Sequence, residues 1–99
     1  MLDKLRCTDF VPLVGEAFRV ARDGLEPLSL TLVSATEIGA PRSPEQRQPF
    51  SLLFLGPESR QYLLQGTYHL EHGRLPGLEL FIVPLGPQAG RMQYEAIFT

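Results

Sequence analysis

Hydrophobic and polar residues alternate with a period of two along most of the chain beyond residue 17. This period puts successive side chains on opposite faces, so each such segment predicts a strand with one buried face. The predicted strands cover residues 18–20, 28–38, 50–55, 62–64, 67–72, 78–85 and 93–98. Glycine and proline pairs separate several of these segments and favour turns. Six or seven short strands with turn signals between them indicate an all-β protein.

The first 17 residues have a different pattern, which favours a short helix. Leu2 and Leu5 are three positions apart and would share one helical face. Thr8 and Asp9 are typical capping residues and predict a second short turn, with Gly15 as its stop. We therefore expect a short N-terminal helical segment in front of the strands.

Length and strand size together predict the architecture. A chain of 99 residues has the length of one small domain, so residues 1–99 are expected to form a single domain. A small sheet removes its unpaired edges by curling, which predicts a strongly bent antiparallel β-barrel of the size of Sm or SH3 domains. A small sandwich is the alternative. Residues 39–49 contain three prolines and no large apolar side chain, and predict an exposed loop.

Charge and cysteine content narrow the classes of partner. Nine basic residues against eleven acidic ones give a net charge of −2, and the basic residues form no run. Nucleic-acid binders cluster their basic residues, so the sequence argues against nucleic acid. The single cysteine, Cys7, excludes an intrachain disulfide, and we expect a cytoplasmic protein. No apolar stretch reaches the roughly 20 residues of a membrane-spanning helix, so we expect no membrane contact.

Histidine and cysteine supply few candidates for catalysis. His69, Glu71 and His72 form the only histidine cluster, and Glu79 could approach it across a turn. On a strand His69 and Glu71 share a face while His72 lies opposite, whereas catalytic zinc needs three protein ligands. A nucleophilic Cys7 would need a neighbouring base, which the sequence does not place. We predict no catalytic residue, no cofactor and no metal, and hence no enzyme.

Three motifs in the C-terminal half resemble a bacterial family. They are Gln-Gly-Thr-Tyr at 65–68, Leu-Phe-Ile-Val-Pro at 80–84 and Tyr-Glu-Ala-Ile-Phe at 94–98. In this order they are similar to an uncharacterised family of small all-β proteins classed as a domain of unknown function, and the likeness spans residues 8–98. The resemblance implies no activity and no site residues. The resemblance suggests that the genes of such proteins lie near phage-tail-like genes.

The order of the elements also resembles the Sm-like fold, in which a short helix precedes about five bent strands. Residues 13–20, LVGEAFRV, stand where such proteins lead from the helix into the first strand. Residues 35–39, ATEIG, stand in place of the Asp-x-x-x-Asn loop of that family, and Gln65-Gly66 is the nearest match to its Arg-Gly motif. The resemblance implies an Sm-like RNA-binding module as the alternative function, without those RNA-contacting residues.

Two of the predicted strands, residues 50–55 and 78–83, are apolar on both faces. A barrel interior covers one face, so the other must meet the N-terminal segment or another chain. The interface candidates on that second face are Leu53, Leu55, Phe81, Val83 and Ile97. We therefore expect a non-catalytic protein–protein interaction or assembly module that self-associates as a homo-oligomer, in a phage-tail-like or secretion-related apparatus.

Overall fold

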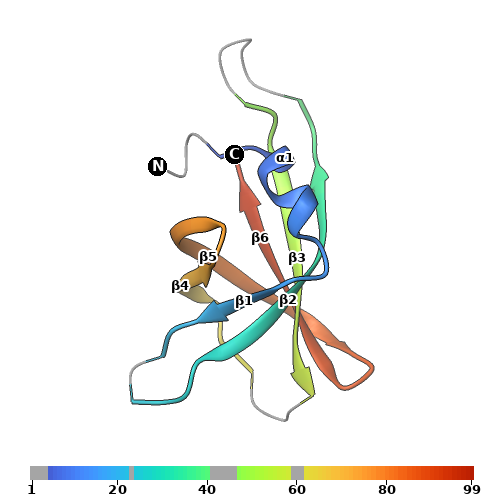
Figure 1. The fold of residues 1–99 in the computed structure, drawn as a ribbon. Helices are drawn as coiled ribbons and strands as arrows, with labels where there is room; N and C mark the ends of the chain where they lie inside the picture. The colour runs from blue at the N-terminus through green and yellow to red at the C-terminus, as the bar shows by residue number, and fades with distance from the viewer. Residues whose placement is uncertain (1–4, 23, 41–46, 59–61) are drawn as a thin grey trace.

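The structure is a computed structural model that describes residues 5–22, 24–40, 47–58 and 62–99. The described chain forms a closed six-stranded barrel preceded by a short helical segment (Figure 1). The elements are α1 (Cys7–Phe10), the 3-10 helix η2 (Val11–Leu13), β1 (Ala17–Val20), β2 (Leu28–Glu37), β3 (Phe50–Glu58), β4 (Gly66–His72), β5 (Leu75–Gln88) and β6 (Arg91–Phe98). This arrangement confirms the predicted small antiparallel barrel with a short N-terminal helix.

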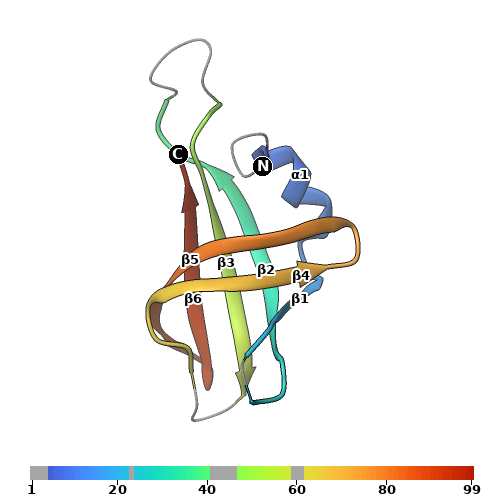
Figure 2. The ribbon, with the colours of Figure 1, turned by 90° about the vertical axis from the view of Figure 1, so that its left-hand side faces the viewer.

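The strand order around the barrel is β1-β2-β3-β6-β5-β4, and every neighbouring pair is antiparallel. The last strand therefore lies beside β3, and the β4–β5 hairpin is placed between β6 and β1. Figure 2 shows this hairpin running across β6, β3 and β2. The barrel closes between β1 and β4 through two residue pairs, Arg19 with Glu71 and Val20 with Leu70. This is its shortest ladder of paired residues among the described strands.

Burial follows the predicted two-residue period. On β5, Leu78, Leu80 and Ile82 are buried while Phe81 between them is exposed. The largest fully buried side chains are Tyr94, Phe10, Phe18, Phe50, Phe54, Leu30, Leu32, Leu52, Leu70, Leu78, Ile82 and Val20. Burying one such side chain stabilises the fold by about 1.5–3 kcal/mol. These residues form one hydrophobic cluster, to which the helical segment contributes.

The helical segment packs against the interior side chains at one end of the barrel (Figure 1). Phe10 is fully buried, and its ring centroid lies 5.7 Å from that of Phe50 and 5.5 Å from that of Phe98. Cys7 and Leu13 are buried in the same cluster. The buried side chains of the segment, on Cys7, Phe10 and Leu13, therefore belong to the core.

The helix begins differently from the prediction. Arg6 is the N-cap of α1, and its backbone N–H donates to the Asp9 carboxylate at 2.8 Å. Thr8 and Asp9 lie inside α1, so the prediction that they cap a second turn was wrong. Gly15 ends the segment as predicted, with a φ of 94° that favours glycine. Leu2 lies outside the described residues.

Two strands are longer than the sequence pattern predicted. β3 continues through Gly56 and Pro57 to Glu58, and β5 continues to Gln88, although a Gly-Pro pair was expected to end each. Both strands change register with β6 in these regions, and such bulges let a strand accommodate glycine and proline without ending. Residues 62–64, predicted as a strand, form none.

The predicted loop at 39–49 lies partly outside the described residues. Its described parts, residues 39–40 and 47–49, contain no strand or helix. Within the described chain no helix has the length and apolar character needed to cross a membrane.

Candidate functional site

Four of the five predicted interface residues lie on the outer side of three adjacent strands, β3, β6 and β5, around one charged side chain. Leu53 on β3 and Val83 on β5 are both paired with Glu95 on β6. Ile97 and Leu55 flank this row on β6 and β3. Ile97 is 54% exposed, while Leu53, Leu55 and Val83 are half-buried. These four residues thus share one apolar surface.

Phe81 adds to this surface on β5, two residues before Val83. It is 53% exposed and pairs with Thr67 of β4. Leu85, two residues beyond Val83, is also exposed and belongs to the same row of β5, although it was not among the interface candidates. The predicted strand at 78–85 includes Leu85, and the two-residue period from Phe81 and Val83 was the signal that could have identified it. We call Leu53, Leu55, Phe81, Val83, Leu85 and Ile97 the outer apolar face.

The described part of the N-terminal segment, from residue 5 onward, does not cover the outer apolar face. Its buried side chains, Cys7, Phe10 and Leu13, belong to the interior cluster, and α1 and η2 lie against β2. The one acidic side chain at the centre of the face is held in place, because the Ser51 hydroxyl donates to the Glu95 carboxylate at 2.8 Å. Among the described residues the face is therefore left open to a partner, and its central carboxylate is already hydrogen-bonded.

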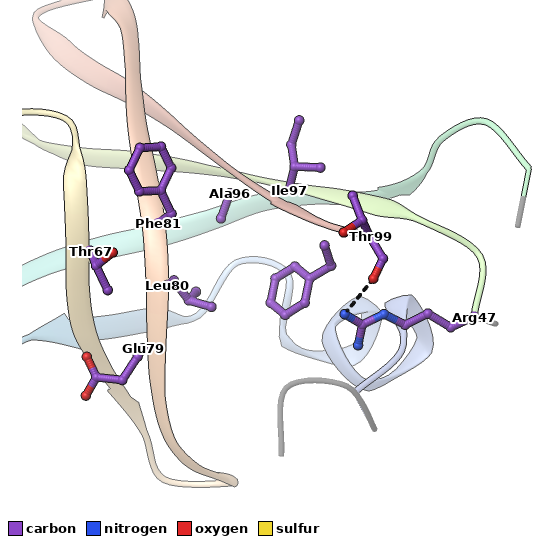
Figure 3. A pocket seen from close by; sticks show the side chains of 9 residues that line it. Arg47, Thr67, Glu79, Leu80, Phe81, Ala96, Ile97 and Thr99 are labelled. Carbon is purple, nitrogen blue, oxygen red and sulfur yellow. Dashed lines mark hydrogen bonds between the residues drawn. The ribbon is translucent and has the colours of Figure 1, made fainter. Parts of the chain in front are cut away.

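A pocket of about 300 Å³ opens beside this face, between β5 and β6. In Figure 3, Leu80 and Phe81 lie on β5, and Ala96 and Ile97 lie on β6 at the other side of the opening. Arg47 stands at the far end, where its guanidinium donates to the Thr99 carbonyl at 3.1 Å and lies over the Phe98 ring. No pattern in the sequence predicted this pocket, since it depends on where β5 and β6 separate.

The histidine cluster divides between two faces, as the two-residue period predicted. His69 lies outside, with its Nδ1 2.8 Å from the Glu79 carboxylate and its Nε2 3.9 Å from that of Glu71. His72 is almost buried and its Nε2 lies 2.7 Å from Glu16. Among the described residues no group of three histidine, cysteine or acidic side chains is placed to hold a metal ion.

His72 has a fixed arrangement of hydrogen bonds. The backbone N–H of Arg74 donates to its Nδ1 at 3.0 Å, so Nε2 carries the proton that is donated to Glu16. Its ring also packs on Phe18 with centroids 4.8 Å apart. These contacts tie the start of β1 to the β4–β5 turn, next to the two-pair seam of the barrel, which is a structural role.

Cys7 is in no position to act as a nucleophile. Its thiol is buried in the core, and burial raises its pKa above the ordinary value of 9.0, with a further rise from the nearby Glu37 carboxylate. A reactive cysteine needs the opposite change, because the thiolate is the nucleophile. Cys7 therefore serves as a small apolar core residue.

The two histidine–glutamate contacts allow a matched prediction. We expect Glu16→Ala to lower the free energy of unfolding by about 1–3 kcal/mol, because it leaves the Nε2–H of the nearly buried His72 without its acceptor. Glu79→Ala breaks a contact of similar length at the exposed His69 and should cost under about 1 kcal/mol. Urea unfolding of the two variants checks this. Equal losses would contradict the structural role of His72.

Comparison with known proteins places the chain in a family. The family model for a domain of unknown function, DUF6916, matches residues 5–98, which include the barrel strands, the helical segment and the outer apolar face. Comparisons with curated proteins and with solved structures gave no significant match. The family match confirms the predicted resemblance to an uncharacterised family classed as a domain of unknown function. The chain therefore belongs to the DUF6916 family of domains of unknown function.

Proposed function

We propose that this protein is a non-catalytic assembly module that self-associates through its outer apolar face. The observation that carries the proposal is the exposure of Phe81 and Ile97, each more than half exposed on a folded barrel. Contiguous apolar surface of this kind marks protein–protein contacts. Its residues come from the three neighbouring strands β3, β6 and β5, so they gather on one side of the barrel.

A second copy is the partner that this face fits best. Homo-oligomers with two-fold symmetry bring the same patch together from both subunits, which requires a patch that is complementary to itself. An apolar patch meets this requirement, and its central carboxylate on Glu95 is already hydrogen-bonded to Ser51. A net charge of −2 adds little repulsion between copies. A component of a tail-like or secretion-related apparatus would need contacts of this kind.

The mass of the native protein tests the proposal. We expect the wild-type protein to elute as an oligomer in size exclusion with light scattering. Phe81→Asp puts a charge into the face and should shift the mass to that of a monomer. Leu25→Asp is the matched control, because Leu25 is exposed in the turn before β2, away from the face, and its charge should leave the mass unchanged.

Two outcomes would contradict self-association. One is a monomeric wild-type protein at the highest concentration tested. The other is a folded Phe81→Asp protein, judged by circular dichroism, whose mass equals that of the wild type. If Phe81→Asp unfolds, Ile97→Asp on the neighbouring strand gives the same test, since Ile97 is as exposed as Phe81.

The alternative function, Sm-like RNA binding, has little support among the described residues. Several arginines are engaged by groups of their own barrel: Arg22 donates to the Glu26 carbonyl, Arg91 donates to the Gly56 carbonyl and Arg74 lies 3.6 Å from Glu16. A gel-retardation assay at low salt decides between the functions. We expect no shift of single-stranded RNA, because binding to phosphates needs clustered cations.

A further inference from the structure

The strands β5 and β6 separate before either of them ends. They pair from Val83 with Glu95 toward the turn that joins them. Beyond that point, the stretch from 75 to 82 pairs only with β4, and the stretch from 96 to 98 pairs only with β3. Each of these stretches therefore has one edge without a partner strand among the described residues. The 300 Å³ pocket lies between the two edges.

The hydrogen-bonding direction of β5 follows from its neighbour β4. The backbone N–H of Ala21 donates to the His69 carbonyl, so the backbone groups of His69 point toward β1. Directions alternate along a strand, so Tyr68 points toward β5 and bonds its partner Leu80. The N–H and C=O of Phe81 must then point away from β4, into the opening, and the same holds for residue 79.

The direction of β6 follows from β2 and β3 in the same way. The N–H of Ile38 donates to the Pro49 carbonyl, which fixes the phase of the β2–β3 ladder. With this phase Leu52 of β3 bonds Ala96 of β6, and Ile97 points the other way, toward β5. The backbone groups of Phe81 and Ile97 thus face the same opening from its two sides.

Pro84 agrees with this phase. It is paired with Tyr94, and proline has no N–H to donate to β6. Because hydrogen-bonding directions alternate along each strand, the backbone groups of Pro84 and Tyr94 point away from each other. The missing N–H of Pro84 therefore costs no hydrogen bond between β5 and β6. Three separate observations, at Ala21, Ile38 and Pro84, therefore give one consistent pattern.

We propose that the opening between β5 and β6 binds an extended peptide segment of another protein, which adds a short strand to the edge of β5. An unpaired strand edge supplies the hydrogen bonds that recognise an extended backbone, and pockets beside it select alternate side chains. Here the apolar floor is made by Leu80, Ala96 and Phe98, and Phe81 and Ile97 stand at the rim. The proposal goes beyond self-association and does not depend on it.

The shape of the site decides the kind of segment. The edge of β5 faces the last residues of β6 across the pocket, which favours a single extended segment, such as a tail or a linker, over a strand that carries its own neighbouring strand. Every strand of the described chain has a neighbouring strand on each side along part of its length, so no described strand of a second copy is a single free segment. This favours a different protein as the donor.

The volume indicates what the segment carries. About 300 Å³ is at the small end of ligand pockets, enough for one or two apolar side chains of a short extended stretch. With side chains alternating, one enters the pocket over Ala96 while the next lies outside beside Phe81 and Ile97. We expect a segment of alternating apolar and small or polar residues, without proline at the pairing positions.

The free protein provides the first test. The amides of residues 79, 81 and 97 point into the opening and should exchange with solvent about tenfold or more faster than those of residues 78, 80, 82, 96 and 98. Hydrogen exchange followed by NMR measures this alternation directly. Equal protection at both sets, measured in protein carrying Leu53→Lys so that self-association through Phe81 and Ile97 is weakened, would overturn the proposed edge.

Peptide selection provides the second test. A random 12-residue library displayed on phage is selected against immobilised protein carrying Leu53→Lys. This substitution places a lysine opposite Glu95 on the outer apolar face, away from the residues that line the pocket, and should weaken self-association. We expect enriched peptides to share an alternating apolar pattern and to protect the amides of residues 79, 81 and 97 from exchange at least tenfold.

Backbone methylation of the best peptide separates strand addition from ordinary apolar binding. Two versions of the peptide are compared, one N-methylated at its odd-numbered residues and one at its even-numbered residues. At least one of them should bind tenfold or more weakly, because methylation removes the N–H groups that pair with a strand edge. Binding unchanged by both methylation patterns, protection at other residues, or no enriched peptide would overturn the proposal. A wild-type protein with the same monomer mass as Leu53→Lys would contradict self-association alone and leave this assay valid.

Discussion

Replacing Phe10 by alanine is expected to lower the free energy of unfolding by about 3–5 kcal/mol, a large share of the stability of a domain of this size. The Phe10 ring is fully buried and lies within 6 Å, centroid to centroid, of two other rings, on Phe50 and Phe98, which themselves stack at 4.5 Å. Its loss leaves a cavity at the end of the barrel. The loss also removes the anchor of the helical segment.

Urea unfolding followed by circular dichroism measures this effect, and the next residue supplies the control. Val11 is 52% exposed, so Val11→Ala should change the free energy of unfolding by under about 0.5 kcal/mol. A Phe10→Ala protein about as stable as the Val11→Ala protein would show that the helical segment is not part of the core. In that case the barrel end would be closed by strand side chains alone.

The second large effect is expected at Tyr94, whose hydroxyl is hydrogen-bonded in the core. The backbone N–H of Leu63 donates to the Tyr94 oxygen at 2.9 Å, and the Tyr94 side chain is fully buried. Tyr94→Phe leaves that buried N–H without an acceptor, which costs about 1–3 kcal/mol. This bond helps to hold the segment before β4 against the barrel, together with the buried Leu63 side chain and the Tyr68 hydroxyl, which donates to the Leu64 carbonyl. Tyr62→Phe is the control, because Tyr62 is half-exposed and should contribute almost nothing.

Alkaline pH gives this prediction a second readout. Burial raises the pKa of Tyr94 above its ordinary value of 10.0, and the hydrogen bond from Leu63 only partly opposes this rise. Above pH 10 the unfolded chain loses the tyrosine proton while the folded protein keeps it, so the free energy of unfolding falls as pH rises toward the folded pKa. Tyr94→Phe cannot ionise and should lose less stability over this range than the wild type.

Cys7 acts in the same direction from a lower pH. Its raised pKa means that stability is lost as pH rises above 9.0, in the wild type and in Tyr94→Phe alike. The difference between the two unfolding curves therefore reports Tyr94 alone. Curves that stay parallel from pH 9 to pH 12 would contradict the burial of the Tyr94 hydroxyl.

The hydrophobic pattern alone predicted most of the strands and the face that each one buries. The alternation in β5 and β6 placed Leu80 and Ala96 inside and Phe81 and Ile97 outside, as the structure has them. This works because a strand has a period of two whatever its neighbours are. The same pattern identified most of the outer apolar face. A strand that is apolar on both faces packs one face into the barrel interior and leaves the other for a partner.

Other features could not be predicted from local sequence. Gly56 and Pro57 are turn residues by propensity, yet β3 passes through them because a bulge against β6 absorbs both. Adding a side chain at Gly56 would bring a carbon within 3.3 Å of the Tyr94 ring, a close approach that the linear sequence does not reveal. Propensity describes a residue alone, whereas the neighbouring strand decides whether the ladder continues.

Alternation along the chain was enough to predict an all-β protein, most of its core residues and a surplus of apolar surface. The insertion of β6 beside β3, the packing of Phe10 into the core and the separation of β5 and β6 at Val83 became known from the folded chain. Side-chain alternation is a local property, whereas strand order and strand separation depend on pairing between distant parts of the chain. The outer apolar face could therefore be predicted in outline, and the opening between β5 and β6 beside it could not.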